Sequence, residues 1–401
     1  MTNHEKIPLS AIAKALAYDD FVFFYQPIIS FITGKVIGVE ALIRWQRTDG
    51  SLVPPSMFIP LAEETGFITE MTQDMFPKLL ADVTKIHQLD SSITVGLNIS
   101  AKDLDTNGFV SSLLQALREH HIDPRKLIVE ITETQIIKLN DHMRNAISAL
   151  DAEGVQIAID DFGSGYSSIA HIRDLHISIL KIDQSFISQV IKSEKCSQIV
   201  DHSITMAHQL GIETIGEGIE TQEVFDFLQC FGCTYAQGFY FSAPLPLADF
   251  LTFLSQNKRY WTIPPLGLIH LAKQDHMDWR RDFVREILNI VSAKDEESKH
   301  KTNTKLPPLG ARECLLGKWY YGVGQEFRGN TLFDQIGIEH EQFHQIVERL
   351  AQAVLAGTTK EQVTESIWSL NKQSQQLQGL LTELHTKVML KYNSLISYWS
   401  D

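Results

Sequence analysis

The sequence predicts an α/β barrel followed by an all-α helical bundle, and three observations lead to this fold class. Strand-like and helix-like segments alternate from about residue 20 to residue 245, as they do when a sheet closes into a barrel. Seven consecutive strand candidates each end in a polar side chain. After a break that contains Pro264 and Pro265, the chain is helical and poor in strand patterns.

Eight segments have the pattern of strands. Short apolar runs at 127–129 and 155–159 are typical of strands buried on both faces. Glycine corners at Gly154 and Gly211 end helices just before the next strand begins. The expected strands cover residues 21–29, 36–45, 93–99, 127–132, 155–160, 179–182, 213–216 and 234–239.

Helical patterns fill the gaps between these strands. Eight strands with intervening helices over about 235 residues suit a TIM-type barrel, whose closed sheet has no edges. The expected helices include residues 57–89, 109–120, 142–152, 196–209 and 221–231.

The chain is expected to hold two or three domains, since its 401 residues exceed the usual size of one domain. The barrel is assigned to residues 1–256, a linker to 257–266, and a helical domain to 267–401. Residues 292–308 carry almost no apolar side chains, so they predict a solvated loop.

The last helix carries a regular apolar stripe. Its apolar positions follow steps of four and three, and Ser374 fills the one missing position. Such a coiled-coil-like stripe predicts packing into an intrachain bundle or along the seam of a dimer, and the pattern fits both. The stripe consists of Val363, Ile367, Leu370, Leu377, Leu381, Leu384 and Val388.

Composition excludes several classes of protein. A net charge of -14 at pH 7 argues against a general nucleic-acid surface, because neutralising phosphates requires clustered Lys and Arg. No apolar run of about 18 residues is present, so we expect no membrane insertion, and the first residues lack the pattern of a secretion signal. Four cysteines are too few for a disulfide scaffold. We therefore expect a cytoplasmic protein.

Cys230 and Cys233 have the spacing of a CxxC redox motif. They precede a predicted strand, whereas a redox pair opens a helix after one. The favoured interpretation is two packed cysteines at the end of a helix.

The polar side chains at the strand ends predict a divalent metal site. Carboxylates that face each other over the mouth of a barrel repel one another unless cations neutralise them. These strand-end residues are Glu40, Asn98, Glu130, Asp160 with Asp161, Lys181, Glu217 and Gln237.

Their chemistry suits hydrolysis of a phosphodiester by two Mg²⁺ or Mn²⁺ ions. Such ions prefer carboxylate and amide oxygens, and a pair about 3.5–4 Å apart activates water and stabilises the leaving oxygen. One ion is expected on Glu40, Asn98, Glu130 and Asp160. Asp160 can bridge to a second ion held with Asp161 and Glu217. Lys181 suits orienting the nucleophile or stabilising negative charge at phosphorus.

The motifs around these residues resemble the EAL family of cyclic di-GMP phosphodiesterases, over about residues 15–255. The resemblance implies a TIM-like barrel, two Mg²⁺ or Mn²⁺ ions, and hydrolysis of cyclic di-GMP to linear pGpG. Two positions depart from the family: Ser164 stands where Thr is usual, and Gly216 where Ala is usual. The motifs are Tyr25-Gln-Pro-Ile, Glu40-Ala-Leu-Ile-Arg-Trp, Asn98-Ile-Ser, Glu130-Ile-Thr-Glu, Asp160-Asp-Phe-Gly-Ser-Gly-Tyr-Ser-Ser, Leu180-Lys-Ile-Asp, Glu217-Gly-Ile-Glu-Thr and Gln237-Gly-Phe.

The same resemblance implies a role for each matching residue. Glu40, Lys181, Glu217 and Asp161 correspond to catalytic positions, Lys181 and Glu217 being those that activate water. Glu133 corresponds to the glutamate that steadies the loop beginning at Asp160. The residues implied around the substrate are Gln26, Leu42, Arg44, Asp183 and Gln237.

A second set of metal ligands lies in the helical part of the chain. His340 and His344 are four residues apart, so on a helix both imidazoles face one side. With His276 and Cys314 they would supply three histidines and a thiolate, which suit tetrahedral Zn²⁺. His270 competes with His276 as the first ligand, but only His276 is followed by a Trp-Arg pair.

The segments around these ligands resemble the chemoreceptor zinc-binding (CZB) domain, over about residues 267–385. The resemblance implies a helical bundle with one zinc ion on His276, Cys314, His340 and His344. The matching segments are Asp275-His-Met-Asp-Trp-Arg, Glu313-Cys-Leu-Leu-Gly-Lys-Trp-Tyr-Tyr-Gly and Glu339-His-Glu-Gln-Phe-His.

Together these resemblances predict a bacterial phosphodiesterase that zinc or oxidation of Cys314 regulates. Two alternatives remain: an inert barrel that binds cyclic di-GMP and passes the signal to an unidentified protein partner, and a zinc-binding scaffold with a purely structural barrel. Members of both families commonly form dimers, so a homodimer is expected.

Overall fold

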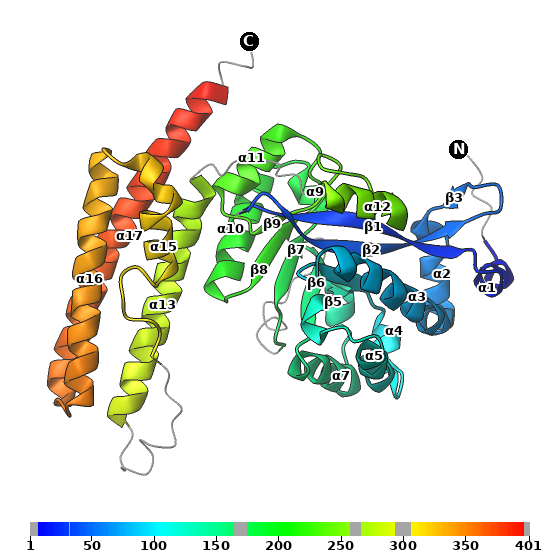
Figure 1. Ribbon diagram of the computed structural model, residues 1–401, viewed down its shortest axis with the longest axis horizontal. Coiled ribbons are helices and arrows are strands. Elements are labelled where there is room, and N and C mark those ends of the chain that lie inside the picture. The colour runs from blue at the N-terminus through cyan, green and yellow to red at the C-terminus, as the bar shows by residue number, and fades with distance from the viewer. Residues whose placement is uncertain (1–6, 32, 164–174, 257–265, 293–305, 397–401) are drawn as a thin grey trace. The chain divides into compact units, whose positions relative to one another are not determined.

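The computed structural model describes residues 7–31, 33–163, 175–256, 266–292 and 306–396. These residues form two compact units, one with the barrel and one with the helices after residue 265 (Figure 1). All but the last residue of the expected linker, and most of the expected solvated loop, lie outside the described residues. None of the described helices combines the length and apolar character needed to cross a bilayer.

The predicted barrel is confirmed, with strands close to the expected bounds. The order around the barrel is β1-β9-β8-β7-β6-β5-β4-β2, and pairing of β1 with β2 closes it. Two short strands, β3 (Leu52–Val53) and β10 (Leu245–Pro246), extend the β1–β2 ribbon. The barrel strands are β1 (Phe21–Ser30), β2 (Val36–Gln46), β4 (Thr94–Asn98), β5 (Leu127–Thr132), β6 (Gln156–Phe162), β7 (Ile179–Ile182), β8 (Glu213–Gly216) and β9 (Tyr235–Ala236).

The first strand departs from a regular TIM barrel. β1 runs antiparallel to both of its barrel neighbours, β2 and β9, whereas the other neighbouring pairs run parallel. The reason is the short connection between β1 and β2, which leaves no room for a helical crossover. The reversal places Gln26 directly opposite Glu40.

Helices cover the outside of this barrel (Figure 1). The expected helix 57–89 is interrupted at Gly66, which takes a left-handed conformation with φ of 82° between α2 and α3. The elements are α1 (Leu9–Ala17), η1 (Pro55–Met57), α2 (Ile59–Thr65), α3 (Phe67–Leu89), α4 (Ala101–Asp105), α5 (Phe109–Glu119), η2 (Pro124–Lys126), α6 (Glu133–Ile136), α7 (Asp141–Ala152), α9 (Gln184–Ile187), α10 (Glu194–Gln209), α11 (Gln222–Cys230) and α12 (Leu247–Ser255).

The side chains inside the barrel form two layers, an apolar layer deeper in the barrel and a polar layer at its mouth. Ile28, Ile128, Ala158, Ile179 and Ile215 form a separate buried cluster inside the barrel. Because alternate residues of a strand face the same side, the residue two positions away also points inward, at the level of the mouth. The pairs are Ile128 with Glu130, Ala158 with Asp160, Ile179 with Lys181, and Ile215 with Glu217.

The second unit is helical, as predicted. Its helices share one hydrophobic core, to which Trp279, Phe343 and Leu377 contribute. Five residues of the apolar stripe are buried within this chain, as the intrachain alternative expects: Val363, Leu370, Leu377, Leu381 and Leu384. Ser374 in the stripe is 0% exposed, and the side chain of Val388 lies outside the described part of the structure. The elements are α13 (Leu266–Ser292), α15 (Leu315–Tyr321), η3 (Val323–Phe327), α16 (Thr331–Leu355) and α17 (Lys360–Ile396).

Candidate active site and metal centres

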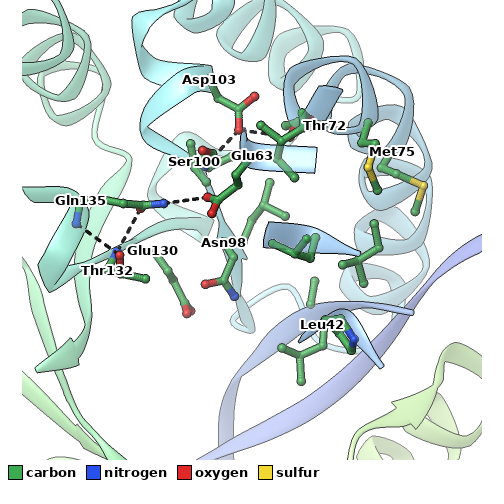
Figure 2. Close-up of a pocket in the computed structure, with 18 of the residues that line it drawn as sticks. Leu42, Glu63, Thr72, Met75, Asn98, Ser100, Asp103, Glu130, Thr132 and Gln135 are labelled. Atoms are coloured by element: carbon green, nitrogen blue, oxygen red, sulfur yellow. Dashed lines mark hydrogen bonds between the residues drawn. The ribbon is translucent and has the colours of Figure 1, made fainter. Parts of the chain in front are cut away.

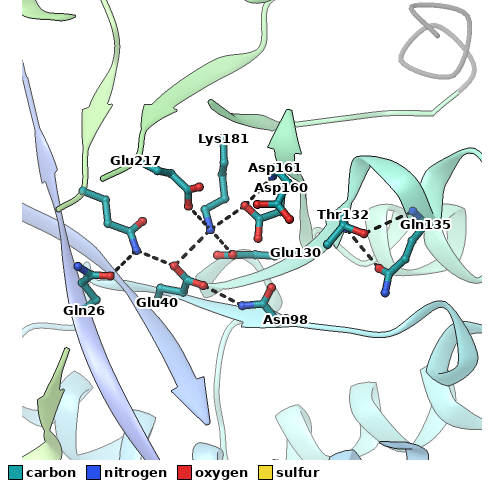
Figure 3. Close-up of polar contacts among 11 residues, drawn as sticks. Gln26, Glu40, Asn98, Glu130, Thr132, Gln135, Asp160, Asp161, Lys181 and Glu217 are labelled. Carbon is teal, nitrogen blue, oxygen red and sulfur yellow. Dashed lines mark hydrogen bonds and ion pairs between the residues drawn. The ribbon is translucent and has the colours of Figure 1, made fainter. Parts of the chain in front are cut away.

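Lys181 lies at the centre of the polar layer and is completely buried. Its Nζ atom lies 2.5 Å from Glu130 Oε2 and 2.8 Å from Glu217 Oε1. It also lies 3.2 Å from Glu40 Oε2 and 3.3 Å from Asp160 Oδ1 (Figure 3). One cation therefore faces four carboxylates, so negative charge is in excess at this site.

The pKa shifts reflect this excess. Burial lowers the pKa of Lys181, but the surrounding carboxylates outweigh it and raise the pKa well above its ordinary value. Burial and the Glu40 carboxylate raise the pKa of Glu130 well above its usual range, despite Lys181. Burial, opposed by Lys181 and assisted by Asp160 and Glu40, raises the pKa of Glu217 to about 8.

Glu40 behaves differently from the other buried glutamates. Burial raises its pKa, but Lys181 and hydrogen bonds from Gln237 and Asn98 outweigh burial and leave the pKa below its ordinary value. Gln237 Nε2 donates to Glu40 Oε2 at 2.6 Å, and Asn98 Nδ2 donates to Glu40 Oε1 at 2.8 Å. Glu40 is thus held as a carboxylate.

Two groups of carboxylates could hold metal ions, and they share one residue. In each group, one oxygen of every member lies within 4.8 Å of the others. The groups are Glu40 with Glu130 and Asp160, and Asp160 with Asp161 and Glu217. The structure thus brings together the carboxylates that the sequence predicted for two ions, with Asp160 between them.

These residues fit divalent ions that prefer oxygen ligands. Glu130 Oε1 is buried and has no hydrogen-bond partner among the described residues, and such an orphaned oxygen is costly unless an ion or water satisfies it. The donors are oxygens throughout, which suits Mg²⁺ or Mn²⁺. Asn98 lies at the end of β4, beside Glu40.

A distortion of β6 explains how two consecutive aspartates can serve one site. The strand register shifts between Ile159 and Phe162, and Asp161 has a left-handed φ of 56°. The Asp161 N–H donates to Asp160 Oδ1 at 2.9 Å. A bulge of this kind redirects a side chain that would otherwise face the other side of the sheet.

Gly96 is a site residue that the sequence reading did not identify. A Cβ atom at this position would lie 2.1 Å from Glu130 Oε1, so any larger residue would have to displace that carboxylate. A glycine within a buried strand often marks such a close approach. The run Val95-Gly96-Leu97 in β4 was therefore an available signal.

Gln26 and Gln237 connect the carboxylate cluster to the β1 side of the barrel. Gln237 Nε2 donates to Gln26 Oε1 at 3.1 Å, and Gln26 Nε2 donates to the carbonyl oxygen of Ser242 at 3.3 Å. Both side chains are buried. They therefore fix the orientation of Glu40 from the side opposite Asn98.

A cavity of about 550 Å³ adjoins the cluster. Leu42, Asn98 and Glu130 line it (Figure 2). Arg44 also contributes to the lining. The remaining wall is mostly apolar and comes largely from α2 and α3. The sequence reading missed the other polar residues of its lining, which are Ser56, Glu63, Thr72, Ser100, Asp103, Thr132, Thr134, Gln135 and Lys138.

The remaining predicted residues lie at the edge of the site. Asp183 begins α9, where its side chain accepts a hydrogen bond from Ser185 N at 3.0 Å. Glu133 Oε2 accepts a hydrogen bond from Gly163 N at 2.8 Å, which holds the start of the loop after β6. Ser164 and the rest of that loop lie outside the described residues.

Of the two departures from the family pattern, only Gly216 lies in the described part of the structure, and it leaves the carboxylate cluster intact. At Gly216, a Cβ atom would lie 2.6 Å from Leu228 Cδ1. The packing of Leu228 accounts for the glycine.

Cys230 and Cys233 are buried and form no disulfide. Burial raises the pKa of Cys233 to about 11, which favours packed cysteines over a redox pair.

In the helical unit, Cys314, His340 and His344 form a second candidate metal centre. One ligand atom of each lies within 4.8 Å of the others. Cys314 Sγ lies 3.2 Å from His340 Nε2, and His344 Nε2 lies 3.1 Å from His340 Nε2. All three residues are buried.

The surroundings prepare these side chains for a metal. His344 Nδ1 donates to the carbonyl oxygen of Leu309 at 2.6 Å, which leaves the Nε2 lone pair directed at the cluster. Gly317 N donates to Cys314 Sγ at 3.2 Å. Burial and the neighbouring His344 lower the pKa of His340 to about 3, so this ligand is neutral. One thiolate and two neutral imidazoles fit Zn²⁺.

His276, the fourth predicted zinc ligand, lies outside this group of three. It is buried, and burial together with the nearby His340 and His344 lowers its pKa to about 3. Its Nε2 atom lies 3.1 Å from Ser374 Oγ on α17. The side chain of His270, the alternative first ligand, lies outside the described part of the structure.

Comparison with known protein families confirms both resemblances. Residues 9–244 match the family model for the EAL domain. Residues 276–351 match the model for the chemoreceptor zinc-binding domain.

Individual relatives match about three fifths of the chain. It is 35% identical over 258 residues to the signaling protein YkoW of Bacillus subtilis, covering 64% of this chain and 32% of YkoW. It is 32% identical over 251 residues to the cyclic di-GMP phosphodiesterase PdeL of Escherichia coli, covering 62% of this chain and 69% of PdeL. The chain spans about half the length, or less, of most of the curated relatives it matches.

A solved structure shows the same barrel. The PaMucR phosphodiesterase, determined as a c-di-GMP complex, superposes with a TM-score of 0.58 at 33% sequence identity. The match covers 60% of this chain and 98% of that structure.

Proposed function

Because the chain belongs to the EAL domain family, we propose that its barrel hydrolyses cyclic di-GMP to linear pGpG with two Mg²⁺ or Mn²⁺ ions. One observation carries the proposal: two carboxylate groups share Asp160 at the mouth of the barrel. The names of the relatives support it, since PdeL is a cyclic di-GMP phosphodiesterase and PaMucR is a phosphodiesterase solved with c-di-GMP.

The reaction adds water across one phosphodiester bond. A bond forms between the water oxygen and phosphorus, the bond from phosphorus to the sugar O3′ breaks, and O3′ takes a proton. Bound divalent ions would lower the pKa of the attacking water and neutralise charge on the phosphoryl oxygens.

The protein's own residues position the reactants. Glu40, Asn98, Glu130 and Asp160 would hold one ion, and Asp160, Asp161 and Glu217 the other. Lys181 Nζ, 2.8 Å from Glu217 Oε1, keeps that carboxylate directed at the second group, where the two residues orient the water.

The substrate is assigned to the mouth of the barrel and the cavity beside it. The cavity reaches Asn98 and Glu130, so a ligand that fills it would also reach the carboxylate groups. The Arg44 guanidinium lines the cavity and suits pairing with a phosphate oxygen. Leu42, Asp183, Gln26 and Gln237 are proposed to complete the binding surface.

The direct test is to incubate the protein with cyclic di-GMP and either Mg²⁺ or Mn²⁺ and to measure pGpG. The wild type should form it, and the Glu40→Ala variant should form none while keeping its circular dichroism spectrum. Glu119→Ala, a change at an exposed glutamate on α5, is the matched control and should leave the rate unchanged. Binding without product would instead support the inert-adaptor alternative.

For the second unit, we propose a zinc sensor that regulates the barrel. Cys314, His340 and His344 are already grouped, and His276 is proposed as the fourth ligand. Zinc supply would set the occupancy of the site, and oxidation of the Cys314 thiolate would remove one ligand. A cytoplasmic location and a homodimer remain part of this proposal.

The regulation is tested by measuring the hydrolysis rate against zinc concentration, with and without reductant. Zinc removal and Cys314→Ser should change turnover in the same direction. Identical kinetics with zinc bound, stripped and oxidised would rule out the coupling but would leave the proposed activity standing.

A further inference from the structure

His276 and Ser374 form a buried polar contact between α13 and α17. Their exposures are 1% and 0%, and His276 Nε2 lies 3.1 Å from Ser374 Oγ. Gln378, one turn further along α17, donates to the same hydroxyl oxygen at 3.1 Å. Ser374 replaces an apolar residue in a seam that includes Leu370 and Leu377. It also lies beyond residues 276–351, the segment that matches the zinc-binding domain model.

The geometry of a tetrahedral zinc site makes this contact significant. Zinc bonds of about 2.0–2.3 Å require all four ligand atoms to lie within about 4 Å of one another. Cys314, His340 and His344 are grouped in this way, but neither ring nitrogen of His276 belongs to the group. His276 must therefore shift relative to these three residues to complete the site. If Nε2 is the nitrogen that binds the metal, as it is the nitrogen that His340 and His344 direct at the cluster, the shift breaks its contact with Ser374.

We infer that Ser374 is a positioning residue that competes with the metal for His276. This inference rests on the proposed zinc site. In the metal-free protein, the Ser374 hydroxyl satisfies the buried imidazole, and binding of the metal removes that hydrogen bond. The hydroxyl therefore weakens metal binding and couples occupancy of the site to α17. Losing a hydrogen bond that exists only in the metal-free state should tighten metal binding about three- to tenfold.

The experiment measures metal affinity in the full-length protein carrying Ser374→Ala. Cobalt(II) is the first probe, because a thiolate-to-cobalt charge-transfer band reports a cysteine-ligated site and ignores the carboxylates of the barrel. Competition of Zn²⁺ with a chromophoric chelator gives the zinc affinity. Cys314→Ser should abolish the band, and Ser369→Ala, at an exposed position of the same helix, should bind metal as the wild type does.

Two further variants test that the effect passes through His276. Gln378→Ala removes the amide that holds the Ser374 hydroxyl, so it should raise metal affinity by a smaller factor than Ser374→Ala does. It also tests the inference if Ser374→Ala folds poorly. In a His276→Ala background, adding Ser374→Ala should change the affinity no further, because the competing ligand is already gone.

The outcomes separate the inference from the site on which it rests. A wild type that gives no charge-transfer band would overturn the zinc site and this inference together. A normal wild-type band with equal or weaker affinity in S374A and Q378A would overturn only the inference. An undiminished effect of S374A in the His276→Ala background would do the same.

Discussion

Gly96 shows how a residue without a side chain sets the geometry of the cluster. A Cβ atom there would meet Glu130 Oε1 at 2.1 Å and Glu130 Cδ at 3.1 Å. We predict that Gly96→Ala displaces the carboxylate and lowers the rate of cyclic di-GMP hydrolysis by about 100-fold, as misplacement by about 1 Å commonly does. The measurement is the initial rate of pGpG formation at saturating Mg²⁺.

Gly38 supplies a matched control, because it is also a strand glycine with little room. Its added Cβ would meet Thr94 Oγ1 at 2.5 Å, which is not a proposed ligand. Gly38→Ala should therefore lower thermal stability but keep most of the activity. If the two variants lost activity equally, strand packing rather than the position of Glu130 would explain the Gly96 result.

Asp103 provides a pH-dependent prediction for the cavity wall. Its side chain caps α4, and Oδ2 accepts hydrogen bonds from Ser100 N at 3.0 Å and Thr72 Oγ1 at 3.2 Å. Burial is the main cause that raises its pKa from 3.8 to about 6. The folded protein holds this proton more tightly than the unfolded chain does. Protonated Asp103 therefore stabilises the fold fully below pH 4, and this stabilisation is lost as the pH rises through 6.

Asp103→Asn should therefore stabilise the barrel at pH 7 and above, because the amide stays neutral and its oxygen still accepts both hydrogen bonds. The gain in the free energy of unfolding should approach about 2–3 kcal/mol and should vanish near pH 4. Denaturant unfolding at a series of pH values measures it, with Glu64→Gln on an exposed side chain as control. A gain independent of pH would contradict this assignment.

The sequence identified the members of the carboxylate cluster because each is a polar residue next to a buried apolar run. Lys181 and Glu130 stand out in this way, since isolated charges in such runs are expensive to bury. Glu63 did not stand out, because it lies in α2, where a charged residue is ordinary. Its cavity forms only when α2 and α3 pack over β2 and β4, and one-dimensional spacing does not encode that packing.

At the scale of elements, the sequence predicted the strands better than their directions. The helices between the later strands imply parallel pairing, and β4 to β9 follow it. Only six residues separate the expected strands 21–29 and 36–45, a distance that allows a hairpin and not a crossover. That signal was present, and it also explains why Gln26 reaches the site from the middle of its strand.

The seam of α17 gives a prediction for the helical unit. Leu377 is completely buried in the core of this unit, so Leu377→Ala should lower its free energy of unfolding by about 2–5 kcal/mol. Ile338→Ala on α16, where the side chain is 53% exposed, should change it by no more than about 0.5 kcal/mol. Urea unfolding followed by far-ultraviolet circular dichroism measures both. Equal effects would show that the stripe does not hold the bundle together.

At the scale of the whole molecule, the two units have separate hydrophobic cores. The main barrel core is built from residues between Ile12 and Phe250, and the helical core from residues between Ile269 and Leu384. Among the described residues, none is shared by these two clusters. Cooperative unfolding follows the extent of a shared core, so each unit should unfold in its own transition.

Each transition should then respond to its own metal. A ligand that binds only the folded form stabilises it by about 2.7 kcal/mol at one hundred times its dissociation constant. In differential scanning calorimetry, Zn²⁺ at that excess should raise one transition, and Mg²⁺ with a nonhydrolysable cyclic dinucleotide should raise the other. Cys314→Ser should abolish the zinc shift alone, and Glu40→Ala the magnesium shift alone. A single transition that either metal raises in both variants would contradict this prediction. It would mean that the two units unfold together. Units with separate cores do so only when contacts between them stabilise the protein as much as the cores do.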